Sequence, residues 1–255
     1  MRLEGKIVLI TGAGSGIGRA LAIKAAKHGA VLYLVGRRAV ALAETKALLP
    51  PGTEAHCVEA DITTPAGRAA IRIVLDGGDR PLDILINNAG AIASAALPDC
   101  SDAISSRLID TNLTAPILLT RDLLPALKRS AAPRLVNVGS VYGDIAMPGF
   151  AIYAATKFGL RGFSDAMRRE LAPDGVTVTY VAPRATQTEG VAEIAASLER
   201  QGAVLDDPTT VAEWIWSAID RKRRNAYPPT AERFFVALQR ICPAAVDRAL
   251  RTCAR

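Results

Sequence analysis

The amino-acid sequence predicts an α/β fold in which a doubly wound, parallel sheet lies between two layers of helices. Short apolar runs rich in β-branched residues alternate with alanine-rich stretches at helical spacing along most of the chain. The runs are apolar throughout, as in strands buried on both faces of a parallel sheet, and such alternation is typical of doubly wound folds. The chain has 255 residues, half of them hydrophobic, and no repeat or linker divides it. We therefore expect a single domain over residues 1–255.

Six strands are visible as apolar runs, in a sheet that we expect to have seven strands. The six runs are Ile7–Ile10, Val31–Val35, His56–Glu59, Ile84–Ile86, Leu135–Val138 and Val176–Val181. Helical spacing marks the stretches Ile17–His28, Ala39–Leu49, Pro65–Leu75, Asp99–Lys128, Tyr153–Leu171 and Pro208–Ile219. The interval Thr186–Leu205 interrupts this rhythm and contains no strand.

The first strand runs into a glycine-rich turn, TGAGSGIG, over Thr11–Gly18, and a helix follows. A turn of this kind lets backbone N–H groups approach a pyrophosphate at the positive end of the helix. The alternative is a tight turn that needs glycine only for its backbone angles. The strand before and the helix after it favour phosphate binding. The residues expected to contact a dinucleotide here are Gly12, Ser15, Gly16, Ile17 and Gly18.

The end of the second strand indicates which dinucleotide is bound. A site for NAD usually carries an acidic residue about 20 residues beyond the glycines, for the ribose 2′-hydroxyl. Here the strand ends in Gly36-Arg37-Arg38, and the first acid after the glycine turn is Glu44. Two guanidinium groups suit a 2′-phosphate through charge-assisted, bidentate hydrogen bonds. We favour NADP over NAD, the alternative being a solvated basic loop.

Tyr153 and Lys157 lie four residues apart in the stretch YAATK, and therefore on one face of the predicted helix. An unperturbed tyrosine has a pKa near ~10, too high for proton transfer at neutral pH. An ammonium group beside the phenol would lower that pKa and make the tyrosine a usable general acid or base. The alternative is a solvated helix face.

Over nearly the whole chain, several motifs in the same order resemble those of the short-chain dehydrogenases/reductases. TGAGSGIG is similar to the family pattern TGxxxGxG, and Asn87-Asn88-Ala89-Gly90 is similar to its NNAG. The remaining matches are Asp61-Ile62, Asn112 in DTNLTAP, Ser140 thirteen residues before Tyr153, and the Tyr153–Lys157 pair itself.

The resemblance implies a Rossmann-like sheet and a catalytic tetrad of Asn112, Ser140, Tyr153 and Lys157. Tyr153 would exchange a proton with the substrate oxygen, and Ser140 would hydrogen-bond that oxygen. Lys157 would depress the pKa of Tyr153 and hold the nicotinamide ribose, and Asn112 would hold a water molecule linking Lys157 to solvent. Hydride would pass directly between substrate and nicotinamide. The alternatives are that Ser140 only caps a turn and that Asn112 only satisfies a helix kink.

The resemblance also assigns further cofactor contacts. Asp61 and Ile62 would contact the adenine, and Asn88, Ala89 and Gly90 would form the floor of the cofactor cleft. The loop after the sixth strand, with Pro183, Arg184, Thr186 and Thr188, would contact the nicotinamide end, Thr188 binding the carboxamide.

Arg184 departs from the family, which usually has glycine at this position. The arginine either points to solvent, narrows the site, or binds an acidic group of the substrate. The following segment, Thr188–Leu205, would be a substrate lid. Its apolar residues at helical spacing are Val191, Ile194, Ala195 and Leu198. The substrate would be a small carbonyl compound or alcohol whose identity these motifs do not specify.

Composition excludes several other classes of protein. His28 and His56 are the only histidines, and neither lies in a metal-ligand pattern, so we expect no metal site and no histidine-based triad. The four cysteines are scattered and show no CxxC spacing, as in reduced intracellular proteins. The N-terminal apolar run is too short for a secretory signal and no run could span a bilayer, so we expect a cytoplasmic protein. No nucleic-acid-binding module is recognisable.

The basic character of the chain belongs to its C-terminal segment. Residues 221–255 contain nine Lys/Arg and two Asp/Glu, a net charge of +7, whereas the whole chain has a net charge of +6. Within the tail of about residues 231–255, the stretch Ala231–Ile241 places Phe234, Leu238 and Ile241 on one helical stripe. Val246 and Leu250 begin a second stripe after Pro243. The tail is either an amphipathic helix docked on its own domain or a contact to an anionic membrane surface.

The resemblance implies a homodimer or homotetramer. In the family, the long helices here identified as Asp99–Lys128 and Tyr153–Leu171 pair across a two-fold axis. Their apolar residues include Leu119, Leu123, Phe158, Phe163 and Met167. Two rival functions stay open: a dinucleotide-sensing regulatory protein without turnover, and a membrane-peripheral scaffold.

Overall fold

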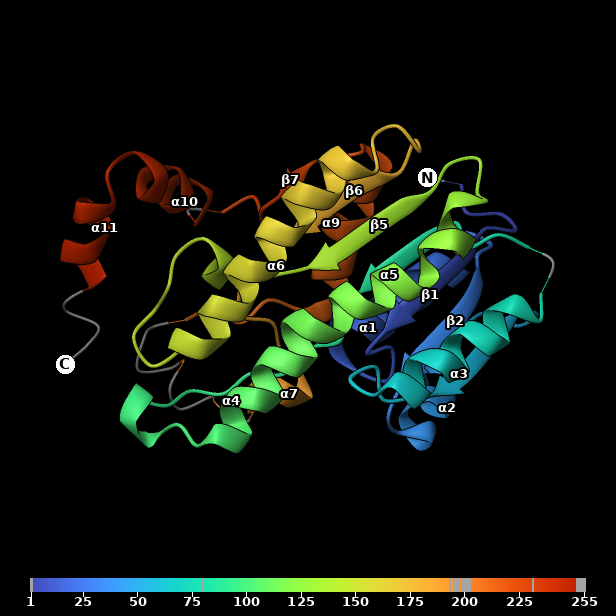
Figure 1. Cartoon of the computed structure of the whole chain (residues 1–255), viewed down its shortest axis with the longest axis horizontal. Helices are drawn as coiled ribbons and strands as arrows, with labels where there is room; N and C mark the ends of the chain where they lie inside the picture. The colour runs from blue at the N-terminus through green and yellow to red at the C-terminus, as the bar shows by residue number, and fades with distance from the viewer. Residues whose placement is uncertain are drawn as a thin grey trace.

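A computed structural model describes residues 2–78, 80–192, 194, 198, 203–230 and 232–250. It contains one parallel sheet with the strand order β3-β2-β1-β4-β5-β6-β7 (Figure 1). The strands are β1 (Ile7–Thr11), β2 (Val31–Gly36), β3 (Ala55–Glu59), β4 (Ile84–Asn87), β5 (Arg134–Val138), β6 (Thr177–Val181) and β7 (Asn225–Ala226). The predicted seven-stranded, doubly wound parallel sheet is confirmed.

The seventh strand is the one that the hydrophobic pattern does not reveal. β7 has two residues and pairs with Tyr180 and Val181 at the edge of the sheet. It follows a run of four basic residues, Arg221–Arg224, and contributes a single buried side chain, that of Ala226. A strand this short leaves no apolar run to detect.

The helices largely follow the predicted spacing. They are α1 (Gly16–Ala26), α2 (Ala39–Ala47), α3 (Pro65–Asp76), α4 (Asp102–Ile109), α5 (Ala115–Lys128), α6 (Ala151–Glu170), α7 (Glu189–Ala192), α9 (Pro208–Asp220), α10 (Glu232–Ile241) and α11 (Pro243–Leu250). Short 3₁₀ turns cover Leu97–Asp99 and Val141–Gly143. No helix in the described part of the chain is both long enough and apolar enough to cross a bilayer.

The predicted single helix Asp99–Lys128 is wrong in detail. α4 begins after Ser101, whose hydroxyl accepts a hydrogen bond from the amide of Ile104 at 3.3 Å. A π-helical turn, Asp110–Thr114, then separates α4 from α5. Pro116 has no N–H to donate to the carbonyl of Asn112, so the α-helical ladder is interrupted at this point. The interruption places Asn112 inside the molecule.

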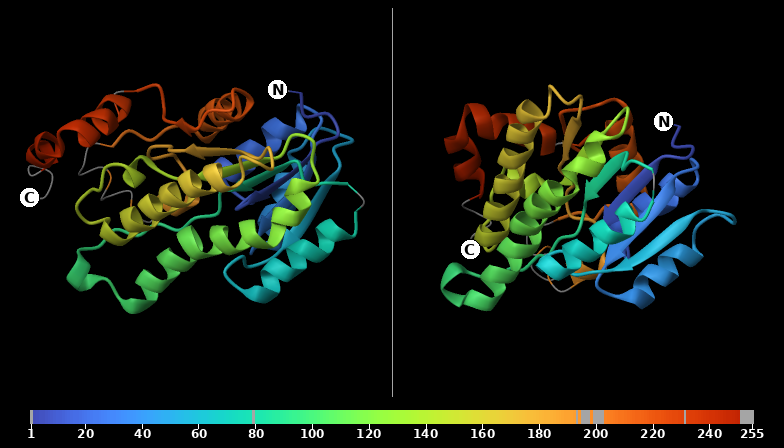
Figure 2. Two further views of the ribbon diagram at one scale, coloured as in Figure 1. Left: turned by 45° about the horizontal axis from the view of Figure 1, so that its top comes forward. Right: turned by 45° about the vertical axis from the view of Figure 1, so that its right-hand side comes forward.

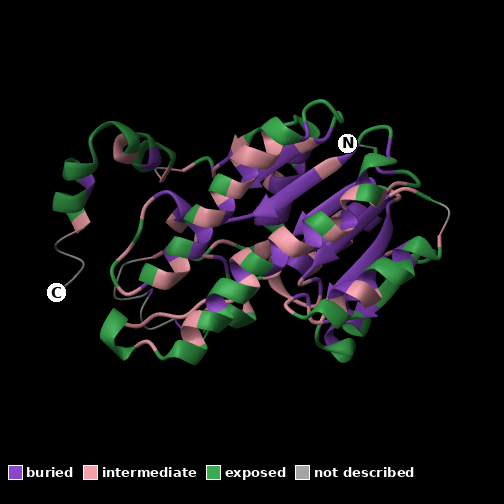
Figure 3. Cartoon of the chain, in the orientation of Figure 1, coloured by how far each residue is buried: buried purple, intermediate pink, exposed green. Residues whose placement is uncertain are grey.

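Two apolar cores lie on the two faces of the sheet. Alternate residues of β1 point to opposite sides, with Val8 and Ile10 in one core and Ile7 and Leu9 in the other. α1, α2 and α9 cover the first face, whereas α3, α5 and α6 cover the second (Figure 2). β1, β2, β4, β5 and β6 are buried almost throughout (Figure 3), as the continuous apolar runs predict. The edge strand β3 differs, because His56, Cys57 and Glu59 are exposed.

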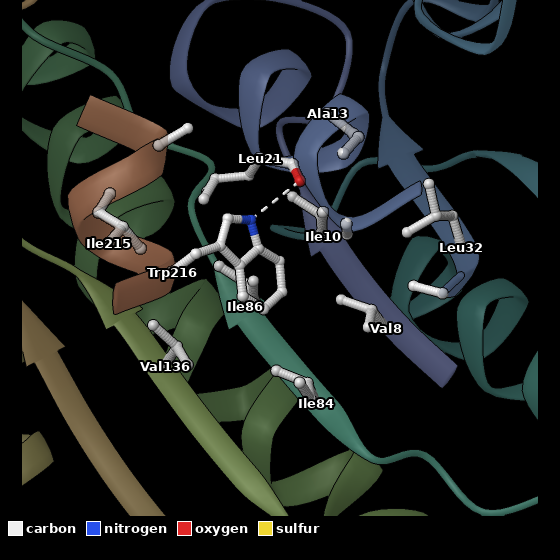
Figure 4. Close-up of a cluster of buried hydrophobic side chains, with 14 of the residues drawn as sticks. Val8, Ile10, Ala13, Leu21, Leu32, Ile84, Ile86, Val136, Ile215 and Trp216 are labelled. Atoms are coloured by element: carbon white, nitrogen blue, oxygen red, sulfur yellow. Dashed lines mark hydrogen bonds between the residues drawn. The ribbon is translucent and has the colours of Figure 1, made fainter. Parts of the chain in front are cut away.

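Trp216 of α9 packs in the first core and links α9 to α1. Its indole Nε1 donates a hydrogen bond to the carbonyl oxygen of Leu21 in α1 at 3.1 Å, and its ring packs among the side chains over β1 and β4 (Figure 4). A buried indole N–H needs such a partner to avoid a desolvation penalty. The contact fixes α9, which follows the lid segment, against α1, which follows the glycine turn.

Candidate active site

A cleft of about 530 Å³ lies at the carboxyl ends of the strands, where ligands bind in open α/β sheets. Its walls come from the loops after β1, β2, β4, β5 and β6, together with α6 and the start of the lid. The predicted site residues that line it are Gly12, Ser15, Gly16, Ile17, Arg37, Arg38, Asn88, Ala89, Gly90, Ser140, Tyr153, Lys157, Pro183, Arg184, Thr186 and Thr188. Four other predicted site residues do not line it, namely Gly18, Asp61, Ile62 and Asn112.

The glycine turn and the NNAG segment are locked together. The Thr11 hydroxyl accepts hydrogen bonds from the backbone amides of Asn88 and Ala89, each at 3.0 Å. The Asn88 side chain donates to the carbonyl oxygens of Thr11 at 2.9 Å and Gly12 at 3.3 Å. A Cβ atom at Gly18 would overlap the Gly12 carbonyl, so glycine is required there for close packing rather than for lining the cleft. Thr11 is a supporting residue that our sequence analysis missed.

The glycine turn is also clamped from the side of α2. Arg19 donates to the Gly14 carbonyl oxygen at 2.5 Å and forms an ion pair with Glu44 at 2.9 Å. Glu44 is the first acid after the glycines, and its ion pair with Arg19 holds it beside the glycine turn. Arg37 and Arg38 stand at the end of β2 and line the cleft. The position usually taken by the acid of an NAD site is therefore basic here.

Arg38 already has a partner across the mouth of the cleft. Its Nη2 lies 2.5 Å from Oε2 of Glu189, the first residue of α7, and both side chains are more than half exposed. The preceding lid residue, Thr188, sits against the glycine turn, because a Cβ atom at Gly16 would lie 2.6 Å from its Cγ2. Thr188 and Glu189 therefore contact both the glycine turn and the end of β2. Glu189 is another residue that our sequence analysis did not single out.

Asp61 shapes the turn that follows β3. Its Oδ1 accepts hydrogen bonds from the amide of Thr63 at 2.9 Å and from its hydroxyl at 2.7 Å. Burial alone would raise the pKa of Asp61, but these hydrogen bonds and the nearby charge of Arg37 hold it below its ordinary value. Asp61 is therefore a charged neighbour of the arginine pair. The adenine contact expected of Asp61 and Ile62 stays a prediction.

Ser140, Tyr153 and Lys157 come together at the inner end of the cleft. The hydroxyl of Ser140 hydrogen-bonds the phenol of Tyr153 and also accepts the amide of Tyr142 at 3.1 Å. Lys157 is buried, with its Nζ 5.7 Å from the centroid of the Tyr153 ring. Ser140 therefore caps the turn after β5 and faces Tyr153 at the same time. The two sequence-based interpretations of Ser140, a cap of the turn and a partner of the substrate oxygen, are therefore compatible.

The pKa of Tyr153 departs from the sequence-based expectation. Burial raises the pKa of Tyr153 to about 12, although the Ser140 hydrogen bond acts to lower it. Burial also lowers the pKa of Lys157 to about 8. The expected lowering of the Tyr153 pKa by Lys157 is therefore not seen, and the ammonium of Lys157 donates to the carbonyl oxygen of Val138 at 3.2 Å.

Asn112 connects the loop after β4 to α6. Its side chain accepts the amide of Ala91 at 2.7 Å and donates to the Ala91 carbonyl at 2.8 Å and to the Thr156 hydroxyl at 3.2 Å. A Cβ atom at Gly90 would lie 3.3 Å from its Oδ1 and 3.7 Å from Nζ of Lys157. Asn112 therefore supports the cleft wall beside Lys157, and its expected water contact stays a prediction.

Arg184 is bound by two carboxylates of the protein itself. Its Nε and Nη2 donate to the two carboxylate oxygens of Asp206 at 2.8 and 2.6 Å, and its Nη1 donates to Glu232 at 3.2 Å. These hydrogen bonds raise the pKa of Arg184 above its ordinary value. Of the three sequence-based alternatives, a side chain that only points to solvent is wrong, whereas narrowing of the site and binding of an acidic substrate group stay predictions. The arginine joins the loop after β6 to the end of the lid and to α10.

An apolar cluster lies beside Tyr153. Phe150, Ile194 and Leu198 are buried together, and several partly buried side chains pack against them. The packed side chains are Ile92, Tyr142, Met147, Tyr153, Ala185, Val191 and Ala203. Val191, Ile194 and Leu198 pack in this cluster, as their apolar spacing predicts, whereas Ala195 lies outside the described residues. That the segment is a substrate lid stays a prediction. The space next to Tyr153 therefore has an apolar wall.

Two residues that the sequence analysis missed support the turn that carries Ser140. The phenol of Tyr180 hydrogen-bonds both the carbonyl and the amide of Ser140. The carboxylate of Asp144, buried four residues after the serine, accepts Arg161 at 2.6 Å and Arg240 at 2.8 Å. Two glycines mark this contact in the sequence, because a Cβ atom at Gly139 would overlap the Tyr180 ring and one at Gly143 would overlap its hydroxyl oxygen. In the described part of the chain, no group of three His, Cys, Asp or Glu side chains could hold a metal ion.

Comparisons with known proteins agree with this geometry. The family model of the short chain dehydrogenases matches residues 6–199. The ketoacyl reductase HetN of Nostoc sp. is 31% identical over 256 residues, covering 98% of this chain and 89% of that protein. A short chain dehydrogenase/reductase from Burkholderia phymatum, solved in complex with NAD, has a TM-score of 0.85 at 27% identity, covering 94% of each chain.

A second solved structure is similar over an even larger part of the chain. The short-chain dehydrogenase from Sphingobium yanoikuyae, in complex with NADPH, has a TM-score of 0.81 at 32% identity and covers 98% of this chain and 96% of that one. The family match, the relatives and the site geometry lead to the same assignment. The chain belongs to the short-chain dehydrogenase/reductase family of nucleotide-binding oxidoreductases.

Proposed function

We propose that the protein is an NADP(H)-dependent oxidoreductase that interconverts a carbonyl compound and its secondary alcohol, with Tyr153 as the general acid and base. The observation that carries this proposal is the Ser140–Tyr153 hydrogen bond beside the buried Lys157, at the inner end of a cleft that begins at the glycine turn. When bound, the nicotinamide supplies or accepts the hydride. The protein residues hold the substrate oxygen and move its proton.

In the direction of reduction, the protonated phenol of Tyr153 donates its proton to the substrate oxygen as hydride reaches the carbonyl carbon. Ser140 hydrogen-bonds the same oxygen. The phenolate left behind is stabilised by the ammonium of Lys157, which stands 5.7 Å from the ring centroid and is mostly charged below its pKa of about 8. A proton from solvent then restores the phenol. Oxidation of the alcohol follows the same steps in reverse.

The residues at the outer end of the cleft fit a phosphorylated dinucleotide. The glycine turn leads into the N-terminus of α1, which favours an anionic pyrophosphate. Arg37 and Arg38 suit a 2′-phosphate, and Glu44, the first acid after the glycine turn, is paired with Arg19. The similar solved structures include one with NAD and one with NADPH, so the preference rests on these arginines.

The preference can be tested by titrating NADPH and NADH into the wild type and Arg37→Ala. We expect tighter binding of NADPH by the wild type. Arg37→Ala should lose on the order of 1.5–3 kcal/mol of NADPH binding energy and little NADH binding energy, because one charge-assisted contact is removed. Equal affinities for the two cofactors in the wild type would reject the preference.

The substrate is proposed to carry an apolar substituent next to its carbonyl group. The support is the cluster of Phe150, Ile194 and Leu198 with Tyr142 around Tyr153. The relative from Nostoc sp. is named a ketoacyl reductase, so ketoacyl thioesters belong in the first screen. A panel of apolar and polar ketones, followed by NADPH oxidation, tests the substrate class. Turnover confined to polar sugars would contradict it.

A homodimer or homotetramer is the assembly we propose, with α5 and α6 pairing across a two-fold axis. Of the apolar residues expected at that contact, Leu119 and Leu123 are fully buried in the protein's own core and are not available. Phe158 is 42% exposed on α6, and Phe163 and Met167 are partly exposed. Light scattering at micromolar concentration tests this proposal, and a monomer would refute it.

The rival proposal, a regulatory protein that binds a dinucleotide without turnover, finds no specific support. Such a protein would have no need for Ser140, Tyr153 and Lys157 to meet in one cleft. Tight NADPH binding together with no oxidation across the whole carbonyl panel would nevertheless favour it over the enzyme.

A further inference from the structure

α10 faces the protein with its polar side and solvent with its apolar side. Phe234, Leu238 and Ile241 are spaced i, i+4 and i+7 and share one face of the helix. Phe234 is 69% exposed and Ile241 is 83% exposed. The sequence-based alternative of an amphipathic helix docked on its own domain is therefore wrong about the docking face.

The opposite face of α10 makes the contacts to the protein. Glu232 binds Arg184 at 3.2 Å, and Arg240 binds the buried carboxylate of Asp144 at 2.8 Å. Val236, between these two residues on the same face, is buried. Turning the helix to bury its apolar stripe would break both ion pairs and leave Asp144 with fewer partners. The outward orientation of the stripe is thus determined by specific contacts.

The neighbouring helix leaves the stripe uncovered. α11 contacts α10 and buries Val246, but Phe234 and Ile241 stay exposed. Both helices lie at one end of the molecule (Figure 1), and most of their surface is exposed (Figure 3). An exposed group of large apolar side chains on a soluble surface costs free energy unless a partner covers it.

The charge of this region decides which partner fits. Residues 231–255, which include α10 and α11, contain five arginines and two acidic residues, a net charge of +3. The other four basic residues of the C-terminal segment, Arg221–Arg224, precede β7. A two-fold contact between two copies of α10 would bring two such segments together, with repulsion between them. An anionic lipid surface has the complementary charge and accepts apolar side chains at its headgroup boundary.

We propose that α10 attaches the protein peripherally to an anionic membrane. Phe234, Leu238 and Ile241 enter the headgroup boundary, and the exposed Arg233 and Arg248 contact lipid phosphates. The inference is independent of the proposed reaction. Because Glu232 and Arg240 link α10 to the loop after β6 and to the turn that carries Ser140, the membrane-facing helix is built onto the wall of the cleft.

Sedimentation of the full chain with vesicles tests the proposal. We expect binding to vesicles of phosphatidylglycerol and phosphatidylcholine, and at least about tenfold weaker binding to phosphatidylcholine alone or after a rise from about 0.05 to about 0.5 M salt. The double variant Phe234→Ser/Ile241→Ser should bind anionic vesicles at least about tenfold more weakly than the wild type, because two apolar side chains no longer insert.

The matched control replaces two exposed apolar side chains on other helices. Val40 on α2 and Ile73 on α3 are 74% and 67% exposed, so Val40→Ser/Ile73→Ser removes a similar exposed apolar area without touching α10. We expect this control to bind vesicles like the wild type. Thermal melting of both variants verifies that they are folded. The dependence of wild-type vesicle binding on lipid charge and on salt tests the proposal without any variant.

Two outcomes would overturn the proposal. The first is a wild type that does not sediment with anionic vesicles at low salt. The second is equal loss of binding in the test and control variants. If the wild type fails to bind vesicles and light scattering shows a dimer that Phe234→Ser/Ile241→Ser dissociates, the partner of α10 is a second copy and not a membrane.

Discussion

The phenol of Tyr180 lies 3.1 Å from the carbonyl oxygen of Ser140 and 3.3 Å from its amide nitrogen, so one side chain holds both polar groups of the serine backbone. Tyr180 is fully buried in β6, and burial raises its pKa, which keeps the phenol protonated. The Tyr180 side chain occupies the space above Gly139 and Gly143 that a Cβ atom would need. The orientation of Ser140 towards Tyr153 therefore depends on the neighbouring strand.

This relationship predicts that Tyr180→Phe damages catalysis more than cofactor binding. Removing the hydroxyl takes away the partner of the Ser140 amide and one of the two donors to its carbonyl oxygen, which keeps the amide of Gly143 at 2.9 Å. The serine then holds the substrate oxygen in a less fixed position. We expect kcat to fall about tenfold or more, with the Kd for NADPH unchanged. Steady-state kinetics and a cofactor titration measure the two effects.

Tyr33→Phe is the matched control for this experiment, since Tyr33 is also buried in a strand, β2, but stacks on His56 away from the cleft. It should retain the wild-type kcat. If Tyr180→Phe also turns over at the wild-type rate, Tyr180 does not position the serine.

The pH dependence of reduction should follow Lys157. Its pKa is lowered to about 8, so the ammonium is present below that pH and is lost as the pH rises through it. Tyr153, with a pKa of about 12, stays protonated over the same range and does not limit the reaction. We therefore expect kcat/KM for carbonyl reduction to be highest below about pH 8 and to fall above it.

Lys157→Arg separates the charge of this residue from other effects of pH. A guanidinium keeps its charge throughout the range, so the fall near pH 8 should disappear in this variant, whatever its absolute rate. A wild-type profile that is flat from about pH 6 to about pH 10 would contradict the assignment.

Glu189 should weaken NADPH binding. Its carboxylate pairs with Arg38 at 2.5 Å and competes with a 2′-phosphate for the same guanidinium. In Glu189→Gln we expect the Kd for NADPH to fall about threefold to tenfold at low salt, with little change for NADH, because the pair is exposed and partly screened. Fluorescence titration of both cofactors measures this.

Glu213→Gln on α9 removes a carboxylate of similar exposure that pairs with Lys24 at 3.3 Å, and it serves as the control. An equal gain in that variant would attribute the effect to net charge. No gain in Glu189→Gln would show that Arg38 does not face the phosphate.

Local patterns in the sequence sufficed to predict the sheet, most of the helices and most of the cleft lining. The apolar runs of β1 and β4 are buried on both faces, and strand–helix alternation fixes the edge at which Gly12, Asn88 and Ser140 meet. The motifs are contiguous in sequence, so their chemistry can be recognised without tertiary information.

The features that were missed or misjudged depend on contacts between distant segments. The sequence-based alternatives for Arg184 rest on its local motif, whereas its ion-pair partners Asp206 and Glu232 lie 22 and 48 residues away in the sequence. The pKa of Tyr153 follows from burial, which a helical spacing does not reveal. The outward face of α10 depends on the ion pair between Arg240 and Asp144, and an amphipathic pattern alone predicts the reverse.

The most direct test of the central claim is the rate of NADPH-dependent carbonyl reduction by Tyr153→Phe. The substitution removes the proton donor and keeps the ring among Tyr142 and the apolar side chains beside it. We predict a loss of kcat of about 10²–10⁴-fold, the usual contribution of a positioned general acid, with the Kd for NADPH close to that of the wild type. A variant that keeps roughly half of the wild-type rate would show that Tyr153 is not the proton donor.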